Sequence, residues 1–323
     1  MRPVAYLGLA LSLVLSTMAL AAPPPLDDPE GAIVEELVVV ARDRGPAWWR
    51  VSDDDTTVYI LALPDTGLPK DLKWDTAGLE RRLRGSNALI GGGRSFRLNS
   101  LRNIGLLLSL RRSLRMKGTM EAELPVDLRT RFVAAREAAG KDAKHYAGWG
   151  PMVAGFILVA DSREGGRGRK AEDDVQRMAR KLKIRESRRE TRDAAPVIKE
   201  FKSGLTPEIQ TACLASALDD VEAGPGVAAE AAQGWARGDI GAALKAPRGF
   251  EKCFQVVAGG PAVWRQNVDD QAKDIAEALT KPGKAVAMVR LRQLIAQKGV
   301  IETLEEMGFE VEGPAVKPDP ARP

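Results

Sequence analysis

The chain has 323 residues, of which 44% are hydrophobic, so it is long enough to bury a core in one large domain or two small ones. Its formal net charge of +4 is too weak a bias to predict nucleic-acid binding. The sequence contains one histidine, His145, which excludes a zinc site built from several histidines, such as an H-E-x-x-H motif.

The N-terminal residues 1–21 have the three parts of a secretory signal peptide. Arg2 gives a positive start, residues 7–15 form an apolar run, and residues 19–21 (Ala-Leu-Ala) are a small-x-small cleavage site. We therefore expect cleavage before about Ala22 and a periplasmic or secreted protein. A retained anchor is the alternative, although the apolar run is shorter than the roughly 20 residues that a spanning helix needs. No later stretch is apolar enough to cross a bilayer, so an integral membrane protein is not expected.

Strand patterns dominate the next part of the chain. The expected strands are residues 32–40, 48–52, 56–61 and 88–90, of which the second and third form a hairpin. The hairpin turn carries three consecutive aspartates, a composition that favours a solvated turn over a metal loop. Between the last two strands, Thr76 is placed to cap a short helix that carries Leu79 and Leu83.

Apolar residues at helical spacing then predict a largely helical middle. The expected helices cover residues 104–110, 128–135, 152–157, 175–182, 206–224 and 268–279. Thr206-Pro207 has the N-cap and N1 signature of a helix start.

The C-terminal part returns to strands. A turn leads into an apolar strand at residues 285–289, and a helix at 300–307 precedes a last strand at 309–311. We therefore predict an α/β fold (mixed α+β), with a mixed β-sheet of N- and C-terminal strands covered by the helical middle. One domain is expected over residues 22–312, followed by a disordered tail at 313–323.

Two cysteines, Cys213 and Cys253, occur in a chain that is expected to enter an oxidising compartment, where thiols tend to pair. We expect one disulfide, which closes a loop of about 40 residues and contributes roughly 3 to 4 kcal/mol in the chain-entropy model. A metal pair is the alternative, but C-x-x-C spacing and neighbouring histidines are lacking.

A basic stripe surrounds the amphipathic helix expected at residues 175–182. Its members are Arg163, Arg167, Arg169, Lys170, Arg177, Arg180, Lys181, Lys183, Arg185, Arg188 and Arg189. A solvated face is the favoured interpretation, and an anionic envelope surface of lipid or lipopolysaccharide is the alternative. The predicted compartment argues against nucleic acid as a partner.

No catalytic residue can be assigned from the motifs. His145 would have to serve any Ser-His-Asp triad, but the sequence has no G-x-S-x-G elbow. Tyr146 and Trp149 beside it indicate a packed or surface helix residue.

Several short segments occur in an order and spacing that carry more weight together than alone. They are residues 46–52 (P-A-W-W-R-V-S), 57–61, Leu68-Pro69, Trp74, 149–158, 235–239 (W-A-R-G-D), Gln266-Asn267 and 299–309. Together they resemble the TraB/GumN family, whose eukaryotic relatives include the Tiki proteases. The resemblance covers most of the chain after the signal peptide.

Family members thought to be active carry two G-x-x-H motifs and a glutamate, which would hold a divalent metal that activates water for peptide or ester hydrolysis. In this sequence the first motif falls on residues 62–65 and ends in Asp65, whereas the second falls on residues 287–290 and ends in Arg290. The place of the glutamate falls near Gly91. The chain is therefore similar to a divergent member that lacks the metal-site histidines.

The resemblance implies a vestigial cleft. Its candidate residues are Asp65, Gln266, Asn267 and Arg290, of which Asn267 matches the family's R-N pair and Gln266 replaces its arginine. An arginine stays protonated and cannot ligate a metal, so no cofactor is expected and a divalent metal is disfavoured. Arg290 is expected to pair with Asp65 in the metal's place or to bind an anion.

Two functions stay open. The first is a periplasmic pseudoenzyme, a non-catalytic binding or scaffold module with an unknown partner or ligand. The second is a divergent metal-dependent hydrolase or peptidase with a rearranged site around Asp65 and Asn267.

Overall fold

The computed structural model describes residues 45–91, 95–162, 168–187 and 191–315. The predicted signal peptide, the strand expected at residues 32–40 and the tail from residue 316 lie outside the described residues. Within the described part, no helix is long and apolar enough to cross a membrane.

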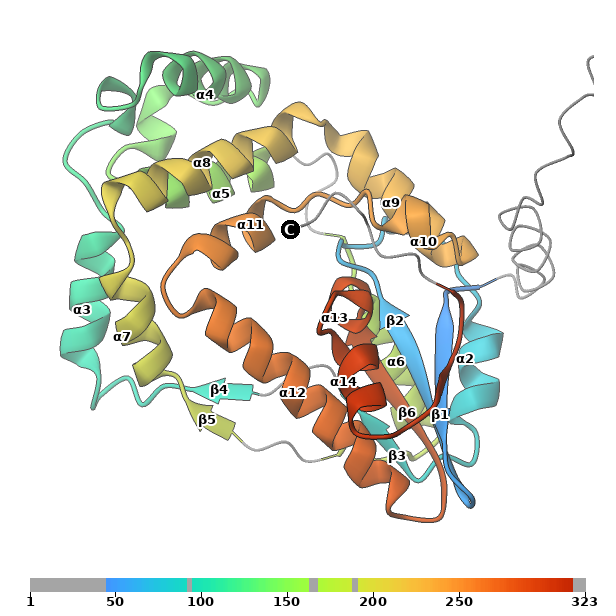
Figure 1. The fold of residues 1–323 in the computed structure, drawn as a ribbon. Coiled ribbons are helices and arrows are strands. Elements are labelled where there is room, and N and C mark those ends of the chain that lie inside the picture. The colour runs from blue at the N-terminus through green and yellow to red at the C-terminus, as the bar shows by residue number, and fades with distance from the viewer. Residues whose placement is uncertain (1–44, 92–94, 163–167, 188–190, 316–323) are drawn as a thin grey trace, which may run out of the picture. The chain divides into compact units, whose positions relative to one another are not determined.

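A mixed five-stranded sheet organises the N- and C-terminal parts of the described chain (Figure 1). Its order is β3-β6-β2-β1-β7. The strands are β1 (Trp48–Ser52), β2 (Thr56–Leu63), β3 (Ala88–Ile90), β6 (Gly283–Arg290) and β7 (Val311–Glu312). Strand β6 runs parallel to both β3 and β2, whereas β1 is antiparallel to β2 and β7. The predicted mixed sheet of N- and C-terminal strands is thus confirmed.

Strand β6 is buried because it pairs on both edges and is covered on both faces. Residues 285–289 are all buried, and the facing end of β2, residues 60–63, is buried as well. A strand with two covered faces has a continuous apolar run instead of alternation. This explains why residues 285–289 were readable as a buried strand.

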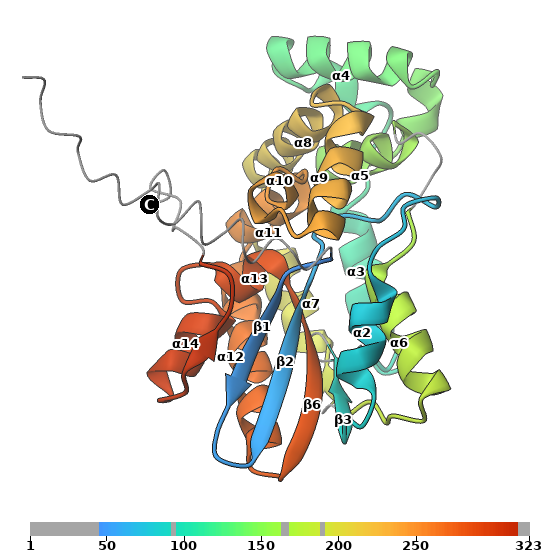
Figure 2. The ribbon, with the colours of Figure 1, turned by 90° about the vertical axis from the view of Figure 1, so that its right-hand side faces the viewer.

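Helices cover both faces of the sheet. Helix α12 (Gly260–Leu279) lies behind the sheet in Figure 2, and α2 (Thr76–Leu83) and α6 (Ala171–Lys181) lie on the other side. Asp75 caps α2, since its carboxylate accepts from the backbone N–H of Gly78 at 2.9 Å, so the prediction of Thr76 as the cap was wrong. An aspartate one residue earlier satisfies the same orphan N–H group.

The middle of the chain is helical, as predicted. Its elements are β4 (Ser95–Arg97), α3 (Ile104–Ser113), α4 (Val126–Ala138), α5 (Pro151–Asp161), β5 (Thr191–Asp193), α7 (Ala195–Ser203), α8 (Pro207–Glu222), α9 (Pro225–Arg237), α10 (Ile240–Ala243) and α11 (Gly249–Val256). The last helices, α13 (Leu291–Ile295) and α14 (Val300–Glu306), follow β6. Thr206 caps α8 through its hydroxyl, which accepts from the N–H of Ile209 at 3.3 Å, and Pro207 is its first residue.

The predicted disulfide is confirmed. Cys213 of α8 and Cys253 of α11 form it across a sequence separation of 40, and both residues are buried. The bond holds α11 against α8, and α11 carries one wall of the cavity described below.

The basic stripe is partly neutralised in the structure. The first turn of α6 contains three acidic residues, and one of them, Asp174, pairs with Arg169 and with Arg177 at 2.9 Å. Arg163, Arg167, Arg188 and Arg189 lie outside the described residues. A role of this stripe toward an anionic surface stays a prediction.

Candidate functional site

The site lies where two parallel strands end. Strands β2 and β6 pair in a register that sets Leu63 opposite Arg290. Asp65 and Arg292 each follow two residues later, so the register brings them to the same edge of the sheet. The carboxyl ends of parallel strands form the usual ligand crevice of α/β folds.

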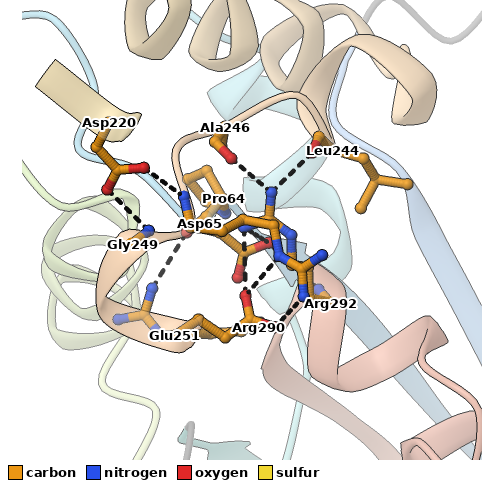
Figure 3. A network of polar contacts seen from close by, with 10 residues as sticks. Pro64, Asp65, Asp220, Leu244, Ala246, Gly249, Glu251, Arg290 and Arg292 are labelled. Atoms are coloured by element: carbon orange, nitrogen blue, oxygen red, sulfur yellow. Dashed lines mark hydrogen bonds and ion pairs between the residues drawn. The ribbon is translucent and has the colours of Figure 1, made fainter. Parts of the chain in front are cut away.

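Arg292 is the centre of this edge (Figure 3). Its side chain is 3% exposed, and its Nη2 donates to the carbonyls of Leu244 and Ala246, each at 2.7 Å. Its Nη1 lies 3.8 Å from Asp65 Oδ2 and 3.6 Å from Glu251 Oε2. The backbone N–H of Arg292 also donates to Asp65 Oδ2 at 3.3 Å. The guanidinium is therefore fixed between two carboxylates and two carbonyls.

Arg248 and helix α8 fix the position of Glu251, which lies on α11. Arg248 donates to both of its carboxylate oxygens, at 2.7 and 3.3 Å. Asp220 of α8 accepts from the backbone N–H groups of Arg248 and Gly249, at 3.1 and 2.8 Å, and so anchors the start of α11. A Cβ at Gly249 would lie 2.4 Å from the carbonyl oxygen of Ser216, so the close approach of α11 to α8 requires glycine.

Burial raises the pKa of Asp65 above its usual range. The positive charges of Arg292 and Arg290 lower this pKa, but they do not offset the cost of removing the carboxylate from water, and Glu251 adds to the rise. Asp65 is thus a largely buried carboxyl group, with a side chain 11% exposed, that holds its proton more tightly than an exposed aspartate does.

A cavity of about 530 Å³ opens beside this network. All four residues of the predicted cleft, Asp65, Gln266, Asn267 and Arg290, line it. The structure thus brings them together, although their role in binding or catalysis stays a prediction. Asn267 donates from its amide to Gln293 Oε1 at 3.2 Å, and the buried Gln271 donates to the same oxygen at 3.1 Å.

The rest of the cavity wall is aromatic and charged. Phe96, Phe250, Phe254 and Trp264 line it. Phe250 stacks on Phe254 with ring centroids 6.2 Å apart. At the wall between α12 and β5, Arg192 donates to Asp270 at 3.0 Å. The cavity therefore combines apolar rings with both signs of charge.

The expected pairing of Arg290 with Asp65 stays a prediction, although the charge of Arg290 counters the rise in the pKa of Asp65. The ion pair of Asp65 in the structure is with Arg292, and the exposed Arg290 donates from Nη1 to the carbonyl of Pro64 at 3.2 Å. Sequence reasoning missed Arg292 because the motif comparison ended at Arg290. The parallel register of β2 and β6 is the signal that would have found it.

The residues at this edge do not fit a divalent metal. The two carboxylates, Asp65 and Glu251, face a guanidinium, which has no lone pair to donate and repels a cation. Gly91, near the expected place of the glutamate, has no side chain. Among the described residues, no group of three histidine, cysteine, aspartate or glutamate side chains is arranged to hold a metal.

His145 lies in a structural contact. Its Nε2 is 2.8 Å from Asp161 Oδ2, and the hydroxyl of Tyr146 donates to the same oxygen at 3.0 Å. The imidazole packs edge to face against the Tyr146 ring. His145 does not line the cavity beside Arg292.

A family model described as the TraB/PrgY/gumN family matches residues 47–313, which is nearly all of the described chain. No curated protein and no solved structure gave a match.

Proposed function

Because the chain belongs to the TraB/PrgY/gumN family, we propose that it is an exported protein whose cavity binds a ligand without hydrolysing it. The observation that carries this proposal is the Arg292 network at the carboxyl ends of β2 and β6. There a guanidinium lies between Asp65 and Glu251, the two carboxylates that this edge of the cavity offers.

The network argues against metal-dependent hydrolysis. A divalent ion at Asp65 would face the charge of Arg292 at short range, where repulsion in a partly buried site is strong. Arg292 is also held by the carbonyls of Leu244 and Ala246, so displacing it would leave these two groups without their donor.

The cavity residues outside the Arg292 network indicate the chemistry of the ligand. Arg290 is exposed, lines the cavity and has a planar fork of donors that suits a carboxylate. The rings of Phe250, Phe254 and Trp264 offer an apolar wall beside it. A volume of about 530 Å³ lies in the range of small-molecule sites. We therefore propose a ligand that joins an anionic group to an apolar one.

Export is the second part of the proposal. It rests on the signal-peptide pattern of residues 1–21. The disulfide between Cys213 and Cys253 supports it, because disulfides persist in oxidising compartments such as the periplasm.

Hydrolysis is the alternative function, and the raised pKa of Asp65 favours it. A buried carboxyl group with a raised pKa beside a cavity is a typical general acid or base. Asp65 would then act in a rearranged site.

One set of measurements separates the two functions. N-benzoylglycine is a small anionic probe with a phenyl group, and its uncharged amide is the matched control. We expect the carboxylate to raise the melting temperature of the protein and the amide to have no effect. Arg290→Gln should abolish the shift, whereas Arg237→Gln, an exposed arginine outside the cavity, should keep it.

The same protein is then assayed for metal content and for peptide hydrolysis with manganese or cobalt added. Turnover that is lost in Asp65→Asn would establish the alternative. Equal shifts from the carboxylate and the amide would contradict an anion site at Arg290.

A further inference from the structure

Helix α3 exposes an unusual face. Leu101, just before the helix, is 89% exposed, and Ile104 and Leu108 are 59% and 58% exposed. At about 100° per residue, Ile104, Leu108, Arg111 and Arg112 lie on one side of α3. Arg111 and Arg112 are exposed too. One face therefore presents apolar side chains in its first half and arginines in its second half.

The opposite face of α3 is already used. Leu106, Leu107 and Leu110 are half-buried, and α3 packs against α7, which lies beside it in Figure 1. The exposed side chains are thus not turned outward by a loose helix. They are the outer side of a helix whose inner side is packed.

The segment that contains α3, residues 95–120, carries only positive charges. Residues 95–120 contain no aspartate or glutamate. They contain six basic residues, which are Arg97, Arg102, Arg111, Arg112, Arg115 and Lys117. Arg115 lies over the ring of Trp149, at 3.6 Å from its centroid. Within the described part of the chain, none of the six forms an ion pair, in contrast to the α6 stripe, where Asp174 pairs with two arginines.

We propose that the α3 face, defined as Leu101, Ile104, Leu108, Arg111 and Arg112, binds the surface of an anionic lipid bilayer. A bilayer interface offers phosphate groups to the arginines and an apolar boundary to the leucines and isoleucine. A nucleic-acid duplex presents mainly phosphates and polar base edges at its surface, so these exposed apolar side chains would lose little water there without unstacking bases. The proposal is independent of the cavity and of the ligand proposed for it.

Vesicle co-sedimentation tests the α3 face. All described residues belong to one compact unit, so a chain without the apolar residues 1–21 keeps that unit whole and cannot bind through the signal segment. The probes are phosphatidylcholine vesicles with and without phosphatidylglycerol. We expect binding to the mixed vesicles in low salt, weaker binding as salt rises, and little binding to phosphatidylcholine alone.

Two α3 variants and one control locate the binding. Arg111→Gln/Arg112→Gln should weaken binding by about fivefold for each arginine. Leu108→Gln should weaken it as well, since the exposed leucine would no longer insert. Arg237→Gln/Lys245→Gln, at two exposed positions outside both α3 and the basic stripe, removes the same charge and should bind as the parent does.

Three results would overturn the proposal. The first is no binding to the mixed vesicles in low salt. The second is an equal loss in the Arg237→Gln/Lys245→Gln control, which would indicate a response to net charge alone. The third is vesicle binding that Leu108→Gln leaves unchanged. Charge alone would then account for the binding, and an acidic protein or a nucleic acid would fit the α3 face as well as a bilayer does. Circular dichroism of each variant checks that the fold is intact.

Discussion

Replacing Arg292 by methionine should destabilise the protein far more than any exposed arginine does. Methionine keeps much of the length but removes the donors to the carbonyls of Leu244 and Ala246 and the charge between Asp65 and Glu251. Removing one partner of a buried ion pair leaves an uncompensated charge and costs about 3 to 5 kcal/mol of unfolding free energy. We expect Arg292→Met to lie in this range.

The cost should depend on pH, with a sign that follows from Asp65. Burial already raises the pKa of this carboxyl group, and loss of the Arg292 charge raises it further. Because the folded state then binds more protons than the unfolded state above the usual aspartate pKa, stability falls as pH rises through that window. The gap between parent and variant should therefore be largest near neutral pH and smaller in acid.

Urea denaturation followed by tryptophan fluorescence measures both effects. Arg290→Met is the matched control, since this exposed arginine donates to one backbone carbonyl, that of Pro64, and should cost under about 1 kcal/mol. The double variant Arg292→Met/Asp65→Asn should be more stable than the sum of its single changes predicts. A cost for Arg292→Met below that of Arg290→Met, or one that is independent of pH, would refute the role assigned to the network.

Three further changes have clear expected outcomes. Cys213→Ser/Cys253→Ser removes a bond that closes a loop of 40 residues and should lower the unfolding free energy by about 3 to 4 kcal/mol, and reductant should have no effect on this variant. Trp235→Phe removes the indole N–H that donates to the buried carbonyl of Ala62 at 2.6 Å, and calorimetry should show a loss of about 1 to 3 kcal/mol. Asp65→Asn removes the carboxyl group with the raised pKa, so the stability of this variant should fall less steeply than that of the parent between acid and neutral pH in urea titrations.

The parts of the fold that the sequence predicts are those with long periodic or continuous apolar patterns. Strands β2 and β6 and helix α12 were identified in this way, because each buries several large side chains. Helix α9 was missed, since its buried residues are mostly alanine and glycine, which give no periodic apolar signal. Strands β4 and β5 have three residues each, which is too short to show the alternation of apolar and polar residues that identifies a strand.

The sequence predicted which residues lie at the cavity, but not which of their side chains pair with one another. Motif spacing put Asp65 and Arg290 at the ends of an early and a late strand. The structure pairs these strands in parallel, so their carboxyl ends meet at one edge of the sheet. Whether Arg290 or Arg292 is the buried arginine depends on hydrogen-bond acceptors that a distant part of the chain supplies. Leu244 and Ala246 supply them from the segment between α10 and α11, whose path no local pattern indicates.

The position of Arg292 also gives a reason why two carboxylates can lie close together at the cavity edge. Without a nearby cation, they would repel each other and carry the full cost of removal from water. The Arg292 guanidinium supplies a positive charge from within the chain itself, so Asp65 and Glu251 can both stay largely out of water. An internal cation of this kind is compatible with the proposed binding role, because this edge of the cavity then needs no ligand to keep its carboxylates compensated.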